Sequence, residues 1–163
     1  MQGKSCRADD FIDNVLAKYS NLVFRIAYSQ TKNKADAEDL FQTVFMRLMQ
    51  SNTEFENEQH LKAWLIKATV NCSKTLLTSA WFRRTIGFDS DIATEMVDVS
   101  DVYDTVLRLP AKYRMVIHLH YYEDMSIADM ANALGRNENT VKSQLHRARE
   151  ILKVKLTGGS VYV

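Results

Sequence analysis

Hydrophobic residues in the first half of the chain recur every three or four positions, which is the period of an α-helix. Three such stripes follow one another along the sequence: Phe11, Val15, Tyr19, Leu22, Val23 and Ile26; then Ala37, Leu40, Phe41, Val44 and Leu48; then Leu61, Trp64, Leu65, Ala68 and Cys72. Each stripe gives a helix one apolar face. Three amphipathic helices with short connections predict a compact helical bundle.

The last third of the chain carries the start and stop signals of a helix-turn-helix. Pro110 suits the first turn of a helix, and Ser126 and Asp129 form a capping box for the next one. Gly135 suits a left-handed helix stop, and Asn137 can cap a further helix. The buried side of that last helix is predicted to be Val141, Leu145, Ala148 and Leu152. Helix, glycine turn and helix in this order predict a helix-turn-helix.

Composition supports an all-α fold made of two small helical domains. Hydrophobic residues make up 46% and charged residues 25% of the 163 residues, which is the balance of a globular chain rather than a disordered one. A single proline and five glycines disfavour a turn-rich β architecture.

Charge divides the chain into three parts. Six acidic residues and no lysine or arginine occur from Ile86 to Val106: Asp89, Asp91, Glu95, Asp98, Asp101 and Asp104. Such a stretch is typical of a linker. We therefore expect an N-terminal helical bundle over residues 8–85, an acidic linker over 86–106, and a C-terminal helix-turn-helix domain over 107–157.

Other classes of protein are disfavoured by what the sequence contains. Cys6 and Cys72 lack metal-ligand spacing, and without a signal peptide they are expected to be reduced thiols in the cytoplasm. The apolar runs are too short to span a bilayer. His118 and His120 are two positions apart, so on a helix they point in different directions and make a poor metal pair. We expect no metal, no cofactor and no enzymatic activity.

The last predicted helix has a basic outer face. With its apolar side inward, it turns Lys142, Ser143, His146 and Arg147 outward, with Arg149 at the flank. These side chains can donate to DNA bases and phosphates. The alternative is an ordinary solvated helix, but the cap, glycine and second cap in the correct order favour DNA binding.

Two polar faces in the first unit have more than one interpretation. The exposed side of the second predicted helix carries Asp39, Gln42, Thr43 and Met46, which form either a protein-docking surface or a plain solvent-facing side. On the third helix, Lys67, Asn71, Lys74 and Thr78 share one face, followed by Trp81, Phe82, Arg83 and Arg84. That face suits a nucleic-acid backbone and an unstacked base, or it is simply solvated.

Three segments, in order, resemble the extracytoplasmic-function group of the bacterial RNA polymerase sigma-factor family. Residues 36–42 read DAEDLFQ and resemble the family's DAEDLxQ segment, and residues 63–71 read AWLIKATVN and resemble its aWLyriarN segment. Residues 109–149 resemble its LPxxxR opening and its IAxxLGxxxxTVKSxxxRAR helix-turn-helix. The likeness covers nearly the whole chain, from about Phe11 to Leu156.

The resemblance implies a transcription initiation factor that directs RNA polymerase core to promoters through their −10 and −35 elements. It places the contacts with the β′ coiled coil of core polymerase at Asp39, Gln42, Thr43 and Met46. It places the −10 contacts at Lys67, Asn71, Lys74, Arg83 and Arg84. The −35 contacts fall at Asn137, Thr140, Lys142, Ser143, His146, Arg147 and Arg149, in a domain near the β flap. Members of this family often have an anti-sigma partner.

The chain departs from the family pattern at two informative positions. Thr43 stands where the family usually has glutamate, and Asn139 replaces the glycine that usually precedes Thr140. A rival interpretation is a stand-alone helix-turn-helix regulator with an N-terminal sensor or interaction domain. It explains the last fifty residues equally well but accounts for neither residues 36–42 nor the face around Trp64 and Asn71.

Overall fold

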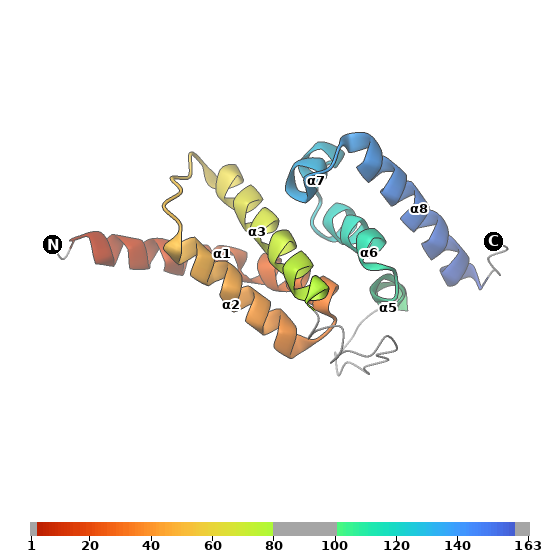
Figure 1. The fold of residues 1–163 in the computed structure, drawn as a ribbon, viewed down its shortest axis with the longest axis horizontal. Helices are drawn as coiled ribbons and strands as arrows, with labels where there is room; N and C mark the ends of the chain where they lie inside the picture. Colours follow the sequence, from red (N-terminus) through yellow and green to blue (C-terminus); the bar gives the residue numbers. More distant parts are fainter. Residues whose placement is uncertain (1–2, 80–100, 159–163) are drawn as a thin grey trace.

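In the computed structural model, residues 3–79 and 101–158 are described, and every regular element among them is a helix (Figure 1). This confirms the predicted all-α class. The elements in chain order are α1 (Gly3–Thr31), α2 (Lys34–Gln50), α3 (Glu58–Thr78), α5 (Asp101–Leu107), α6 (Ala111–Ile117), the π-helical turn η1 (His118–Tyr122), α7 (Ile127–Leu134) and α8 (Glu138–Thr157).

The first three helices pack against one another as the stripes predict. Their buried faces include Val23, Ile26, Val44, Leu65 and Val70, each 0% exposed. The side chains of Asn33 and Asn57 cap α2 and α3 by accepting hydrogen bonds from the first-turn amides.

Phe11 differs from the prediction, because its side chain is 41% exposed although it continues the first stripe. The N-terminal part of α1 projects beyond α2 and α3, so less of the bundle is available to cover it (Figure 1). Phe11 instead stacks on Phe55 of the loop before α3, with ring centroids 6.3 Å apart.

The helix-turn-helix is present with the predicted caps. Ser126 Oγ accepts from the amide of Asp129 at 3.1 Å, and Asn137 Oδ1 accepts from the amide of Thr140 at 2.7 Å. Between them Gly135 ends α7 at φ +64°, the left-handed region in which a side chain is strained. Val141, Leu145 and Ala148 are buried on α8, as expected, whereas Leu152 is only partly buried.

The segment after α6 contains a feature that periodicity did not predict. Instead of continuing as an α-helix, the backbone widens into η1, and the amide of Glu123 donates to the carbonyl of His118, five residues earlier, at 3.2 Å. Single π-helical turns are rare in proteins, and those that occur are often found at functional sites. Here the turn brings the buried side chains of His118 and Glu123 together.

Helix α5 lies almost entirely within residues 86–106, the range that the sequence assigned to the linker. Its residues Val106 and Leu107 are buried, and the helix packs on α6 and α8. The C-terminal unit therefore includes residues before 107. The rest of the predicted linker, residues 86–100, lies outside the described residues.

The two helical units are in direct contact. Helix α7 packs on α3, and α6 packs on α1, so that the helix-turn-helix lies along one side of the N-terminal bundle (Figure 1). Within the described residues, no helix is long and apolar enough to cross a membrane.

Candidate functional site

The predicted docking face of α2 is exposed. Asp39, Gln42, Thr43 and Met46 all lie on the outer side of the helix, and Met46 is 52% exposed. Thr43 Oγ1 donates to the carbonyl of Asp39 at 2.9 Å, so this hydroxyl is partly satisfied within the helix. Met49, which was not among the predicted residues of this face, is 58% exposed. Its i+3 spacing from Met46 would have identified it as part of the same surface.

The predicted strip on α3 is exposed, and one of its residues also bonds to the second unit. Lys67, Asn71 and Lys74 are all exposed, and Lys74 donates from Nζ to the carbonyl of Leu134, the last residue of α7, at 3.4 Å. Partial burial, and secondarily the nearby cation of Arg136, lower the pKa of Lys74. Arg83 and Arg84, the other predicted members of this site, lie outside the described residues.

The predicted face of α8 is exposed along the first three turns. Lys142, Ser143, His146, Arg147 and Arg149 are all exposed, and Asn137 and Thr140 lie at the N-terminal end of the helix. This is the end of a recognition helix that contacts base edges in helix-turn-helix proteins.

Two side chains on this face have intramolecular partners. His146 Nε2 lies 3.3 Å from Glu150 Oε1, one turn further along α8. Arg149 donates from Nε to the hydroxyl of Tyr121 and lies over its ring, with 5.5 Å from Cζ to the centroid. Tyr121, which comes from η1, therefore orients Arg149, a role that no sequence spacing indicated.

A buried charged cluster joins the two units. Glu123 is 3% exposed in its side chain and accepts two hydrogen bonds from Arg25 of α1, at 2.9 Å from Nε and 3.0 Å from Nη2. His118 Nε2 lies 3.1 Å from the same carboxylate. Burial alone would raise the pKa of Glu123, but the hydrogen bonds from His118 and Arg25 hold it below its ordinary value.

A buried cation, the guanidinium of Arg114, lies at the same contact. Arg114 donates from Nη1 to the carbonyls of Leu107 and Leu109, at 3.2 and 2.8 Å, and from Nη2 to the carbonyl of Gln30 in α1 at 3.2 Å. Its burial lowers its pKa to about 10. Arg114 therefore both holds the α5–α6 junction together and reaches across to the first unit.

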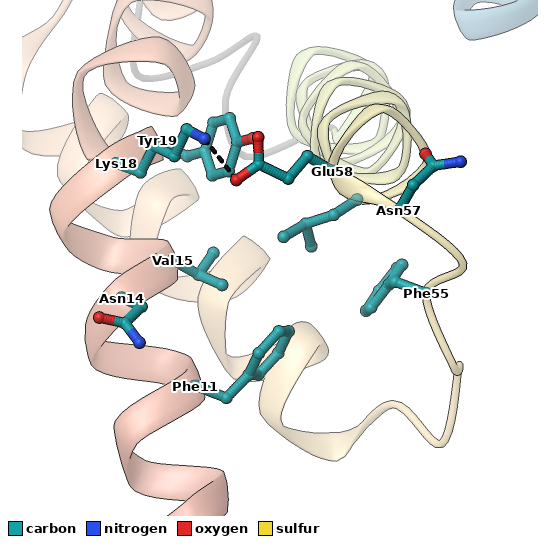
Figure 2. Close-up of a pocket in the computed structure, with 9 residues that line it drawn as sticks. Phe11, Asn14, Val15, Lys18, Tyr19, Phe55, Asn57 and Glu58 are labelled. Atoms are coloured by element: carbon teal, nitrogen blue, oxygen red, sulfur yellow. Dashed lines mark hydrogen bonds and ion pairs between the residues drawn. The ribbon is translucent and has the colours of Figure 1, made fainter.

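At the far end of the N-terminal bundle, an apolar hollow lies between α1, the loop before α3, and the start of α3 (Figure 2). Phe11 and Phe55 line it, and Lys18 pairs with Glu58 across its edge. The described residues contain no group of three or more histidine, cysteine, aspartate or glutamate side chains that could hold a metal.

Comparison with known proteins assigns both units. The family model for Sigma-70 region 2 matches residues 15–83, and the model for Sigma-70, region 4 matches residues 100–152. RNA polymerase sigma factor SigV of Bacillus subtilis is 30% identical over 139 residues, covering 82% of this chain and 84% of SigV. ECF RNA polymerase sigma factor SigL of Mycobacterium tuberculosis is 29% identical over 150 residues, covering 85% of each chain.

The chain belongs to the ECF group of the sigma-70 family. It is an initiation factor that binds RNA polymerase core and directs it to promoter DNA, as its family does. Sigma factors form a non-enzymatic family of transcription factors. The interpretation as a stand-alone regulator fails because residues 15–83 are sigma region 2 rather than a sensor domain.

Solved structures show the same fold. The sigma factor RpoE of Bartonella quintana, in a co-crystal with the anti-sigma factor NepR, matches with a TM-score of 0.69 and 25% identity over 91% of this chain and 97% of RpoE. CnrH, in complex with the cytosolic domain of CnrY, matches with a TM-score of 0.67 and 22% identity over 91% of this chain and 89% of CnrH.

Proposed function

We propose that the exposed faces of α2, α3 and α8 divide the work of initiation among them. The observation that carries this proposal is that each face lies opposite a buried apolar stripe of its own helix, so none of the three is needed for the core of its unit. We assign residues 8–85 to polymerase and −10 binding, 86–106 to the linker and 107–157 to −35 binding, with α5 joining the last unit.

The α2 face docks on the polymerase. Asp39 and Gln42 supply polar contacts, and Met46 supplies an adaptable apolar one, since methionine fits irregular surfaces. Their occupant is the β′ coiled coil of core polymerase, and Thr43 belongs to the same face. The C-terminal unit lies near the β flap in the same assembly.

The α3 face binds the −10 element once the strands separate. Lys67 and Lys74 provide cations for the backbone, and Asn71 provides an amide that can pair with the edge of an unstacked base. Arg83 and Arg84 continue the basic surface.

The start of α8 reads the −35 element as duplex. Lys142, Ser143, His146 and Arg147 face the major groove, and Arg149, held by Tyr121, contacts the backbone. Asn137 and Thr140 lie where the helix N-terminus approaches a phosphate.

Further proposals concern a regulatory partner of the protein, its location in the cell and its lack of enzymatic activity. The Bartonella relative is bound to an anti-sigma factor, and we propose that this chain has such a partner too. It acts in the cytoplasm, where the polymerase is, and catalyses no reaction itself.

The test separates polymerase capture from promoter reading. Purified Asp39→Ala is expected to bind core polymerase about ten-fold more weakly, the effect of one polar contact at an interface. Arg147→Ala is expected to bind core normally but to lose about ten-fold in promoter-specific run-off transcription, because one phosphate or base contact is lost.

A matched control is Lys153→Ala, an exposed cation about one turn beyond Arg149, which should change neither measurement. If Asp39→Ala and Arg147→Ala show the same defect, the proposed division of labour is wrong.

A further inference from the structure

Helix α8 has an arginine at each of its two flanks, and a neutral side chain holds each one. On one flank, Arg149 donates from Nε to the hydroxyl of Tyr121 at 2.5 Å. On the other, Arg136, from the turn before α8, donates from Nη1 to the side-chain oxygen of Gln144 at 2.7 Å. Successive residues of an α-helix are about 100° apart, so Gln144 and Arg149 are about 140° apart around the axis, one on each side of the buried stripe.

The two arginines keep their charge available for an anion, because their partners do not neutralise it. A hydroxyl and an amide oxygen accept a hydrogen bond but carry no charge. Within residues 3–79 and 101–158, neither arginine is paired with a carboxylate. His146, on the outer side of α8 between them, differs in being paired with Glu150 at 3.3 Å. Each guanidinium therefore retains N–H donors that suit the paired oxygens of a phosphate.

Both arginines are also held on rigid supports. Tyr121 belongs to η1, which is fixed from the inside by the buried contact of His118 with Glu123 at 3.1 Å. The backbone of Arg136 is fixed because its amide donates to the carbonyl of Ala131 at 3.0 Å and closes the turn after α7. A side chain that is already held in place loses less conformational freedom when it binds, so this arrangement favours binding.

We propose that Arg136 and Arg149 bind DNA phosphates on the two sides of the major groove that α8 enters, and that Gln144 and Tyr121 position them. The proposal rests on the assignment of α8 to the −35 element. A helix in the major groove lies between two phosphate backbones, which its flanks face. Phosphate contacts fix the orientation of a protein on DNA and carry no sequence information. The pair of arginines therefore sets how α8 lies in the groove, while its outer face reads the bases.

Substitutions of two kinds separate the cations from the groups that hold them. Arg136→Ala and Arg149→Ala each remove a cation. Tyr121→Phe removes only the hydroxyl and Gln144→Met only the amide, so each leaves its arginine in place without the acceptor. The matched control is Arg108→Ala, which removes an exposed arginine that follows α5 in the same unit. Circular dichroism checks that every variant is folded.

The measurement is the affinity of reconstituted holoenzyme for a labelled promoter duplex, followed by fluorescence anisotropy over a range of salt at low temperature, where the strands stay paired. Arg136→Ala and Arg149→Ala should each weaken binding about five-fold and reduce the salt slope by about 0.9, since one phosphate contact is lost. Tyr121→Phe and Gln144→Met should weaken binding about three-fold without changing the slope, because the cation remains. Tyr121→Phe should add nothing to Arg149→Ala, since a positioning residue acts only through its partner.

Sequence discrimination distinguishes the phosphate pair from the −35 assignment. The ratio of affinities for the promoter and for a duplex with a scrambled −35 element should stay the same in Arg136→Ala and Arg149→Ala and fall in Lys142→Ala, which removes a proposed base contact. If either arginine variant keeps the affinity and slope of Arg108→Ala, the phosphate pair is overturned.

If Lys142→Ala keeps the full ratio, the −35 assignment fails instead, and reduced slopes in the two arginine variants still uphold the phosphate pair. A double variant that binds more weakly than Arg149→Ala alone would refute the positioning role of Tyr121.

Discussion

Glu123 is an ionisable side chain that is almost fully buried, and its environment explains how it remains charged. An isolated buried carboxylate would be neutral, because desolvation penalises the charged form. The paired donors of Arg25 and the ring of His118 reverse that tendency and lower its pKa. Breaking one partner of such a buried pair is costly because the other is left without compensation.

This arrangement predicts a defined pH dependence for Glu123→Gln. Because the folded pKa of Glu123 lies below its ordinary 4.5, the carboxylate stabilises the fold above pH 4.5, and this contribution is lost as the pH falls through the lowered pKa. The groups that face it are Arg25 of α1, His118 of η1 and Tyr103 of α5. At neutral pH, we expect Glu123→Gln to lower the free energy of unfolding by about 1–2 kcal/mol, allowing for the half-exposed arginine.

Urea unfolding of both proteins from pH 7 to pH 3 measures this directly. The difference in free energy between them should shrink below pH 4.5, where the protonated glutamic acid resembles glutamine. A difference that is constant over the whole range would contradict the pairing. Other carboxylates titrate equally in both proteins and cancel in the comparison.

At the scale of single elements, features that depend on neighbouring residues could be predicted from the sequence, whereas contacts between residues far apart in the chain could not. The caps Ser126 and Asn137 and the stop at Gly135 are properties of neighbouring residues, so the sequence revealed them. Arg25 and Glu123 are 98 positions apart, and no periodicity links them. The π-helical turn was not predicted for a related reason. It differs from an α-helix in its hydrogen bonds, but its residue types do not distinguish it from one.

The residues of the candidate surfaces could likewise be predicted only where they depend on spacing within one helix. The faces of α2 and α8 are set by helical spacing alone, and their predicted residues are exposed. The hydrogen bond from Lys74 to the carbonyl of Leu134 depends on where α7 packs, which spacing within α3 cannot reveal. Residues 101–106 of α5 were assigned to the linker because of their acidic side chains, although Val106 among them is buried.

The turn of the helix-turn-helix offers a prediction about an element. Gly135 has φ +64° and no atom within 4 Å of where a Cβ would lie, so a side chain there is strained by the backbone but meets no obstacle. We expect Gly135→Ala to lower the free energy of unfolding by about 1–2 kcal/mol. Gly135→Asn should cost less, since asparagine tolerates this conformation.

Denaturation followed by circular dichroism provides the measurement. Equal losses for alanine and asparagine would show that tolerance of the left-handed conformation does not decide this position. No loss for either would show that the left-handed stop does not stabilise α7.

The whole molecule carries little net charge for a DNA-binding protein. Its net charge is +1, and non-specific affinity comes largely from phosphate neutralisation, with a salt slope of about −0.9 per contact. The basic face of α8 is therefore offset by acidic residues elsewhere. A factor with this balance depends on polymerase to hold it on DNA.

We therefore expect the free protein to bind promoter duplex weakly, with a Kd of about 1 μM or above at physiological salt. Titration of labelled promoter DNA with and without core polymerase measures this, and scrambled duplex serves as the control. Nanomolar, sequence-specific binding by the protein alone would contradict the expectation.

The position of Lys74 has a consequence for attempts to engineer this factor. On the assignment proposed above, its ammonium group has two alternative acceptors, the carbonyl of Leu134 and the −10 strand. Selecting variants for thermal stability would favour substitutions that add contacts between α3 and α7, since such contacts stabilise the fold. If Lys74 is needed for the −10 strand, such variants are expected to be more stable and to initiate transcription less well.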